Sequence, residues 1–503
     1  MSVREAGAGS SAIPVRTRTA PPPSFTLNGT AVSLEGIDPH ETLLELARGQ
    51  GYTSVKEGCA EGDCGACTVA VRQTFARGST YRAVVSCLTL AGQLSGVEAW
   101  TAEALSPAPL PDGTVEDLHP LQAAIADGGG TQCGYCTPGF AMSLFAAYYT
   151  APRPGAAPEG DPAGEVLAGN LCRCTGYRAL REAATALAGA GVGRSGDPFW
   201  ERLARPMPPH PSVSVEGRDV IAFRPSTIDE AIQLKIAHPE ARIVAGATDV
   251  GVEVSRGGRR FPAFIMLGAV DQLRDIGRDD TGLRIGAGVT IAELKVWVSP
   301  VTLPLVHRLL PWFGSRQIRN RATVGGNLMT ASPVGDLSVA WLALDAKAVV
   351  QARTGTRTVP ISRFFTGYRQ TVVGPNELLM AVRVPPVVVP PGGRRVEWAH
   401  KVARRDRVDI STVVAAFTVT LNDRGVVTDA RLAYGGVAPV PARAARAESA
   451  LVGASWDADG TAAARAVLAT EFAPIDDVRA SVSYRARLVT NLFDRCVAET
   501  SAP

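Results

Sequence analysis

The 503-residue chain lacks the features that would indicate a membrane, a secretory pathway or a nucleic acid. No segment approaches the roughly 20 uninterrupted apolar residues of a membrane span, and the N-terminus has no apolar core of a secretory signal. The 51 Lys and Arg residues nearly balance the 48 Asp and Glu residues, so no charge excess predicts a nucleic acid or membrane partner. We therefore expect a soluble, cytoplasmic protein.

Cysteine is almost absent from the last two thirds of the chain. Eight of the nine cysteines precede residue 175, and only Cys496 follows. A disulfide scaffold would be small, secreted and evenly cross-linked, so disulfides do not explain this distribution. Clustered thiols in a reducing compartment indicate metal binding. We expect the remaining Cys496, in an amphipathic helix, to be a buried structural thiol.

The length predicts three or four domains at about 150 residues each. An alternating segment around Asn28-Gly29 predicts a hairpin, and Thr42 with Glu45 predicts a capped helix start. A helical pattern begins at His119, and mixed helix and strand signals follow residue 215, with a hairpin expected at 422–425 and a helical stretch at 442–469. The expected fold class is α+β multidomain, with a disordered arm at 1–23, a β-grasp domain at 24–105, an all-helical domain at 106–190, a linker at 191–215, and α+β domains at 216–390 and 391–503.

The first cysteine set has the spacing Cys-x4-Cys-x2-Cys, with a fourth cysteine after 19 further residues. Its members are Cys59, Cys64, Cys67 and Cys87. This is the spacing of a plant-type [2Fe–2S] ferredoxin. Interspersed glycines allow the backbone to wrap a cluster closely and bring N–H groups near its sulfurs. Zinc is the alternative, but zinc sites favour two short cysteine pairs.

The second cysteine set consists of two close pairs separated by 35 residues. Its members are Cys133, Cys136, Cys172 and Cys174. This pattern alone fits a four-cysteine zinc site as well as an iron–sulfur cluster. Both pairs lie at predicted helix starts, where N–H groups and the helix dipole favour an anionic thiolate cluster.

Three segments around these cysteines resemble the iron–sulfur segments of the xanthine dehydrogenase/aldehyde oxidase family: Cys59-Ala-Glu-Gly-Asp-Cys-Gly-Ala-Cys67, Thr131-Gln-Cys-Gly-Tyr-Cys-Thr-Pro-Gly139 and Gly169-Asn-Leu-Cys-Arg-Cys-Thr-Gly-Tyr-Arg178. The resemblance implies two [2Fe–2S] clusters that relay electrons between a molybdenum–pterin centre and a flavin. It implies that the second set lies nearer molybdenum and that Gln132 contacts the pterin on a partner. Arg173, between two ligands, would raise that cluster's potential or simply lie on the surface.

Two glycine-bearing segments after residue 215, at 243–250 and 323–327, are weak signals for phosphate loops by themselves. Both resemble the FAD loops of the same family's vanillyl-alcohol-oxidase-type flavin domain. The implied FAD contacts are Ile243, Val244, Ala245, Gly246, Ala247, Thr248, Asp249, Val250, Phe313, Thr323, Val324, Gly325, Gly326, Asn327, Asp336, Leu379 and Lys401. The segment Gly191-Val-Gly-Arg-Ser-Gly196 matches a dinucleotide motif, but it follows a predicted helix instead of a strand, so we expect no such role.

The resemblance covers residues 24–497, and the chain ends where single-chain family members continue into a molybdenum domain. It therefore implies the small subunit of a two-subunit enzyme, with no catalytic residue in this chain. A large molybdenum-binding subunit would hydroxylate xanthine or hypoxanthine toward urate within a heterotetramer or higher heteromer, and FAD would reduce NAD+. The alternatives are a sister hydroxylase for aldehydes or N-heterocycles, an O2-using oxidase, and a zinc-organised protein-binding scaffold.

Overall fold

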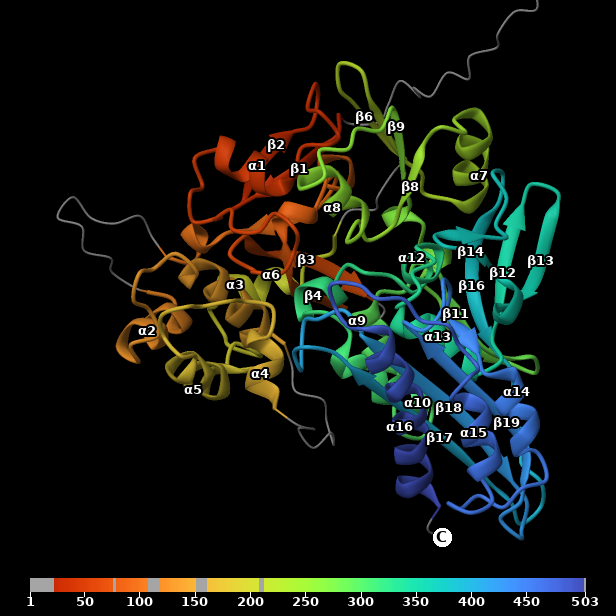
Figure 1. The fold of residues 1–503 in the computed structure, drawn as a ribbon. Coiled ribbons are helices and arrows are strands. Elements are labelled where there is room, and N and C mark those ends of the chain that lie inside the picture. The colour runs from red at the N-terminus through yellow and green to blue at the C-terminus, as the bar shows by residue number, and fades with distance from the viewer. Residues whose placement is uncertain (1–21, 76–77, 107–117, 151–160, 208–211, 502–503) are drawn as a thin grey trace, which may run out of the picture.

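The computed structural model describes residues 22–75, 78–106, 118–150, 161–207 and 212–501. In Figure 1 the red and orange N-terminal parts lie on one side, and the blue C-terminal part forms the opposite end. The predicted arm lies outside the described residues except for Pro22 and Pro23. The chain is α+β and multidomain, as predicted. None of the helices in the described ranges has the length and apolar character needed to cross a lipid bilayer.

The first domain is a mixed five-stranded sheet with the strand order β2-β1-β5-β3-β4. Its strands are β1 (Ser24–Leu27), β2 (Thr30–Ser33), β3 (Thr68–Phe75), β4 (Gly78–Val85) and β5 (Glu98–Trp100). The predicted hairpin is confirmed, since Asn28 and Gly29 adopt φ of 52° and 85°. Helix α1 (Leu43–Gly49) begins at the predicted capping box of Thr42 and Glu45. One helix on a mixed sheet is the expected β-grasp arrangement.

The second domain is helical, as predicted. Its helices are α2 (Pro120–Asp127), α3 (Thr137–Tyr148), α4 (Pro162–Leu167) and α5 (Arg178–Leu187). Helix α3 is buried on almost every side because it packs on the other helices and also on strands β3 and β4. The helical domain is thereby joined to the first domain through a continuous apolar core.

The segment predicted as a linker, 191–215, contains ordered structure that its composition did not indicate. Helix α6 (Pro198–Leu203) begins because the Asp197 carboxylate accepts the N–H groups of the first turn and proline occupies the first position. The Phe199 ring then packs 5.0 Å from the Phe145 ring, centroid to centroid. Gly191 lies against the helical domain, where an added Cβ would be 2.3 Å from a Tyr148 ring carbon. The part of this segment from Gly191 to Phe199 is therefore packed onto the helical domain.

The middle region has two sheets. The first has the order β6-β7-β9-β8 and the second the order β10-β11-β16-β12-β13. The strands are β6 (Val213–Glu216), β7 (Ile221–Arg224), β8 (Arg242–Val244), β9 (Ala263–Met266), β10 (Ile276–Asp279), β11 (Gly282–Gly286), β12 (Lys347–Ala352), β13 (Gly355–Pro360) and β16 (Leu378–Val384). The helices are α7 (Ile228–Ala237), α8 (Val250–Ser255), α9 (Ile291–Trp297), α10 (Pro304–Leu309), α11 (Arg316–Arg319), α12 (Val324–Met329) and α13 (Asp336–Ala343). A small hairpin, β14 (Phe365–Gly367) and β15 (Gln370–Thr371), lies apart from both sheets.

The C-terminal region is a sheet of order β17-β18-β19-β20 with three helices. Its elements are β17 (Arg394–Val402), β18 (Val413–Leu421), β19 (Val427–Gly435), β20 (Ala442–Arg443), α14 (Ala445–Leu451), α15 (Ala462–Leu468) and α16 (Val482–Thr500). The predicted hairpin at 422–425 is confirmed. The stretch 442–469, predicted to be helical throughout, is interrupted after α14 by Gly453, whose φ is +90°. Cys496 is fully buried in α16, as predicted.

Candidate functional site

The first cysteine set converges at the end of the β3–β4 hairpin. Strand pairing places Thr68 opposite Val85, so Cys67 and Cys87 lie side by side just beyond the strand ends. Their thiols are within hydrogen-bonding reach of each other, and so are those of Cys59 and Cys64. Cys67 and Cys87 are buried, whereas Cys59 and Cys64 are half-buried. The four sulfurs therefore form two close pairs.

The loop of the first set surrounds its sulfurs with backbone N–H groups. Cys59 Sγ accepts hydrogen bonds from the N–H groups of Glu61 and Cys64 at 3.4 and 3.3 Å. A Cβ at Gly58 would be 2.7 Å from Cys64 Sγ, so glycine is needed there. The hydrogen bond from the Cys64 thiol, with these N–H groups, lowers the pKa of Cys59 to about 4. Such an environment favours the thiolate, which is the form that binds iron.

The second set also forms two pairs, Cys136 with Cys172 and Cys133 with Cys174. Cys136 is the N-cap of α3, as predicted from the helix start. Burial alone would raise the pKa of Cys172, but the hydroxyl and N–H of Thr175 donate to its sulfur at 3.2 and 3.3 Å and lower that pKa. Cys133 and Cys174 are exposed, so this set opens to the surface.

The paired arrangement of the thiols fits a diiron cluster. In a [2Fe–2S] cluster each of the two irons takes two protein ligands. Two separate thiol pairs in each set fit that requirement.

The two cysteine sets are adjacent although they belong to different domains. The N–H of Leu171, next to Cys172, donates to the carbonyl oxygen of Cys64 at 2.9 Å. The Asn170 side chain donates to the carbonyl oxygen of Gly65 at 2.9 Å. Cys64 of the first set is thus one hydrogen bond and one residue away from Cys172 of the second.

A cavity of ≈ 870 Å³ in the middle region collects the residues expected to contact FAD. Every expected contact lines this cavity except Val324, whose side chain is fully buried in the core. The lining also includes Glu61 and Asp63, which lie between the first-set cysteines. The cavity therefore borders the loop of the first cysteine set.

The two expected phosphate loops differ in their available backbone donors. In the loop at 323–327, the N–H of Val324 donates to Val289, that of Gly325 to Ala287, and those of Gly326 and Asn327 to Thr323. By contrast, none of the hydrogen bonds of the described residues uses the N–H groups at 246–249. The latter loop is therefore the part of the cavity suited to bind a pyrophosphate.

Glycine in each loop is required by close packing. A Cβ at Gly246 would be 1.9 Å from the carbonyl oxygen of Arg321, and one at Gly325 would be 2.6 Å from the Ala287 side chain. The glycines therefore allow the two loops to approach neighbouring backbone. These glycines thus also allow the close packing of the cavity wall.

Asn327 and Lys401 differ in the hydrogen-bonding capacity that they leave free at the cavity. Asn327 Oδ1 is buried without a hydrogen-bond partner and belongs to a cavity-lining residue, so a ligand hydroxyl or N–H could satisfy it. Lys401 Nζ instead donates to Asp336 at 2.9 Å, Trp312 at 3.0 Å and Asp409 at 2.8 Å. All three of its donors are engaged. Lys401 thus joins three segments at the cavity wall.

Several cavity residues were not predicted from the sequence. They are cationic side chains from separate elements: Lys235, Arg242, Arg369, Arg405 and Arg479. Arg369 has a φ of +58° and reaches Asp249 at 3.3 Å, which joins the β14–β15 hairpin to the first loop. Single basic residues in loops carry no recognisable motif, and only the fold brings them together.

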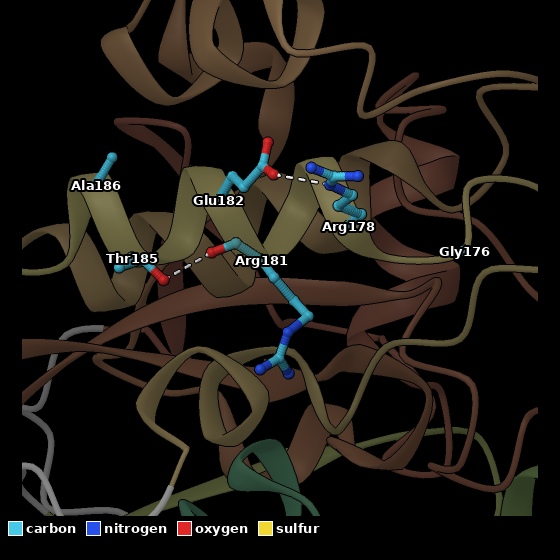
Figure 2. Close-up of a pocket in the computed structure, with 6 residues that line it drawn as sticks. All are labelled: Gly176, Arg178, Arg181, Glu182, Thr185 and Ala186. Atoms are coloured by element: carbon cyan, nitrogen blue, oxygen red, sulfur yellow. Dashed lines mark hydrogen bonds and ion pairs between the residues drawn. The ribbon is translucent and has the colours of Figure 1, made fainter.

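A second, shallow pocket of ≈ 630 Å³ lies on α5. Figure 2 shows Arg178 paired with Glu182, at 3.1 Å, and Thr185 donating to the Arg181 carbonyl at 2.9 Å. Arg181 also pairs with Asp161 at 2.7 Å. These side chains pair with one another or with Asp161 on an exposed helix face. The residues that line the pocket include no set of metal ligands. Gln132 and Arg173, on the nearby second-set loops, are exposed.

Four families of domains match the chain in sequence. They are the 2Fe-2S iron-sulfur cluster binding domain at 25–92, the [2Fe-2S] binding domain at 101–185, the FAD binding domain in molybdopterin dehydrogenase at 216–387, and the CO dehydrogenase flavoprotein C-terminal domain at 398–500. Their order follows the cysteine sets and the cavity along the chain.

Similar whole proteins include xanthine dehydrogenase of Emericella nidulans, 31% identical over 85% of this chain, and xanthine dehydrogenase/oxidase of Gallus gallus, 29% identical over 86%. The chain spans only 35% and 36% of these relatives' lengths. Among solved structures, CO dehydrogenase from Oligotropha carboxidovorans has a chain 26% identical, with a TM-score of 0.52, covering 57% of this chain and 98% of its own.

Proposed function

Because this chain is an iron–sulfur and flavin electron-transfer module of the molybdenum hydroxylase family, we propose that it serves as the electron-transfer subunit of a xanthine dehydrogenase. The proposed reaction is the hydroxylation of xanthine or hypoxanthine toward urate at a molybdenum centre on a partner. NAD+ is the proposed final acceptor. Similarity to xanthine dehydrogenases along most of the chain supports this assignment.

The thiols of this chain would hold two [2Fe–2S] clusters, and the cavity would hold FAD. Such clusters supply single-electron transfer, and FAD supplies the exchange between single electrons and the hydride pair that NAD+ accepts. The chain would contribute thiolates, the N–H groups that stabilise their charge, and the cavity of the middle region. The N–H groups at 246–249 would bind the pyrophosphate, and Asn327 would accept a hydrogen bond from the flavin nucleotide.

One observation carries this proposal: the second set, the first set and the cavity adjoin one another in that order. Leu171 links the two cysteine loops by its hydrogen bond to Cys64. Glu61 and Asp63, in the same loop as Cys64, line the cavity. This arrangement supports a relay that begins at the exposed set and ends at the flavin.

The exposed second set supports a partner at this surface. Cys133 and Cys174 are exposed, and so are Gln132 and the apolar side chains of Tyr135 and Leu171, which are 50% and 47% exposed. We propose that a large molybdenum-binding subunit covers these side chains and that Gln132 contacts its pterin. The assembly would be a heterotetramer or a higher heteromer, located in the cytoplasm.

The test is anaerobic stopped-flow reduction of the chain purified with its molybdenum-binding partner. With xanthine as substrate, we expect cluster bleaching followed by flavin bleaching, and reoxidation by NAD+ faster than by O2. Faster reoxidation by O2 would identify an oxidase. Flavin reduction by an aldehyde, an N-heterocycle or CO, but not by xanthine, would refute the assigned substrate.

A sister hydroxylase is the second candidate, because 57% of this chain matches a chain of CO dehydrogenase in fold. In such an enzyme the residues named above would keep their roles, since none of them contacts the substrate. The substrate screen separates the two candidates because it reports on the partner's chemistry. Metal analysis cannot separate them.

A further inference from the structure

A fully buried hydrogen-bond cluster lies between the two cysteine loops. It consists of Ser143 on α3, Asn170 just before the second cysteine pair, and Gln317 on α11, which are exposed by only 1%, 2% and 0%. These residues are far apart in the sequence and come from the helical domain and the middle region. Buried amides are costly unless they are hydrogen-bonded, so the cluster constrains how these parts meet.

Asn170 uses its complete hydrogen-bonding capacity in this cluster. Its Nδ2 donates to the carbonyl oxygen of Gly65 at 2.9 Å and to the hydroxyl of Thr68 at 3.3 Å. Its Oδ1 accepts from the Ser143 hydroxyl at 2.6 Å and from Gln317 Nε2 at 2.9 Å. An asparagine side chain offers two donors and an acceptor with two lone pairs. One side chain thus joins the loop of each cysteine set and the flavin-side helix α11.

Three glycines allow these segments to approach at backbone contact. A Cβ at Gly65 would be 2.0 Å from the Gly169 carbonyl oxygen, and one at Gly139 would be 2.3 Å from the Gly65 carbonyl oxygen. A Cβ at Gly169 would be 1.8 Å from Gln317 Oε1. The loops are therefore packed without room for a side chain between them, and their separation has little freedom.

Gly65 and Asn170 each lie close to metal ligands along the chain. Gly65 follows Cys64 directly, and Asn170 precedes Cys172 by two residues. Between them, the N–H of Leu171 donates to the carbonyl oxygen of Cys64 at 2.9 Å. Two hydrogen bonds, one from the Asn170 side chain and one from the Leu171 backbone, thus span the boundary between the ligand loops.

We propose that Asn170 is a positioning residue that fixes the separation of the two cysteine sets and keeps the Leu171-to-Cys64 hydrogen bond as the bonded route between them. The inference rests on both sets holding diiron clusters. Electron transfer weakens steeply with distance and is more efficient through bonds than across a gap. Holding Cys64 one hydrogen bond and one residue away from Cys172 therefore sets the rate of exchange between the clusters.

Asn170→Asp tests this role with minimal change in volume. The substitution replaces the donating Nδ2 by a carboxylate oxygen, which repels the Gly65 carbonyl while leaving the acceptor side intact. The matched control is Asn320→Asp, because Asn320 is also 2% exposed and its Nδ2 donates to the carbonyl oxygen of Ala83 at 2.8 Å. Asn320 joins the same middle region to the first domain through strand β4.

The readouts are iron content and the EPR spectrum of the fully reduced chain, followed by the rate of electron exchange between the clusters. In Asn170→Asp we expect four irons to be retained, the magnetic interaction between the clusters to change, and the exchange rate to fall about tenfold, since rates that depend on positioning are sensitive to shifts near 1 Å. Asn320→Asp should keep the wild-type spectrum and rate. A wild-type spectrum and rate in Asn170→Asp would overturn the proposal, as would equal changes in both variants.

Gln317→Glu gives an independent measurement if Asn170→Asp does not fold. It replaces the donor to Asn170 Oδ1 and Ser143 Oγ while leaving both ligand loops unchanged in sequence. We expect a smaller change in the magnetic interaction between the iron–sulfur clusters than in Asn170→Asp. An unchanged magnetic interaction would refute the role of the buried hydrogen-bond cluster. Iron missing from the wild-type chain would instead contradict the proposed cofactors, so the two failures are distinguishable.

Discussion

The two cysteine sets use the same ligand chemistry in opposite surroundings. The first set is enclosed by the β3–β4 hairpin, has two buried thiols and borders the large cavity. The second set has two exposed thiols and lies on loops at the surface of the helical domain. In the proposed relay, the enclosed set would be the inner cluster beside the flavin, and the exposed set would be the outer cluster that meets the partner.

The largest expected effect comes from removing a ligand of the enclosed set. Cys87 is 1% exposed and belongs to the apolar core that joins the first domain to the middle region. Cys87→Ala should lose the first cluster, about half of the iron, and should also weaken flavin retention because its loop borders the cavity. Iron and flavin contents after gel filtration measure both losses. Full flavin content with half the iron would show that the cavity is independent of this loop.

Removing a ligand of the exposed set should give a narrower defect. Cys174→Ala should also lose about half of the iron, while the fold and the flavin remain. In the complex with the molybdenum subunit, substrate should no longer reduce the flavin, although NADH should still do so directly. Normal reduction of the flavin by substrate in this variant would contradict the order of the relay.

Chelation compares the two sets in one sample. With the partner removed, an iron chelator should bleach the second cluster before the first because Cys133 and Cys174 are exposed. EPR of samples quenched over time distinguishes the two signals. Simultaneous loss of both signals would mean that exposure does not control access to the clusters.

An ion-pair cluster joins the helical domain, which carries the exposed set, to the rest of the chain. Glu165 on α4 pairs with Arg319, with Lys295 at 2.7 Å and with Arg407 at 2.9 Å. Burial alone would raise the pKa of Glu165, but Arg319 and Lys295 lower it. Glu165→Gln removes the carboxylate that these three cations share, so we expect a loss of about 3 kcal/mol in the free energy of unfolding.

The pH dependence follows from the sign of this shift. A lowered pKa in the folded state means that Glu165 contributes stability above its unfolded value of about 4.3, and that this contribution is lost as pH falls through the folded pKa. Urea unfolding at several pH values should therefore show that the free energies of unfolding of the wild type and of Glu165→Gln approach each other as the pH falls. The control Glu182→Gln breaks the exposed pair with Arg178 and should change stability by less than about 1 kcal/mol. Equal effects of the two substitutions would refute the role of Glu165.

The smallest expected effect concerns the cysteine outside both sets. Burial raises the pKa of Cys496 to about 12, so this thiol is inert and apolar in character. Cys496→Ala should leave the iron content unchanged and reduce stability by about 1 kcal/mol through lost packing. A loss of iron would show that this residue had been assigned to the wrong class.

Local signals in the sequence predicted the ligand sets, the hairpin at Asn28-Gly29 and the capped start of α1, because each depends on residues close together in the chain. The resemblance of two loops to the FAD loops of a known family predicted a set of FAD contacts, and nearly all of them line one cavity. The helix α6 was not predicted, since Gly and Pro around it obscured the cap at Asp197. The partners of Asn170 and Glu165 lie more than 100 residues away, apart from Ser143. No local pattern encodes such contacts, and only the assembled fold reveals them.

The most direct test of the central claim is metal and flavin analysis of the chain purified under anaerobic conditions. Two diiron clusters and one flavin predict about four irons and about one FAD per chain, with little zinc. The account also predicts that Cys87→Ala and Cys174→Ala each reduce the iron by about half. Zinc in place of iron, with no flavin bound, would contradict the relay and support a structural scaffold.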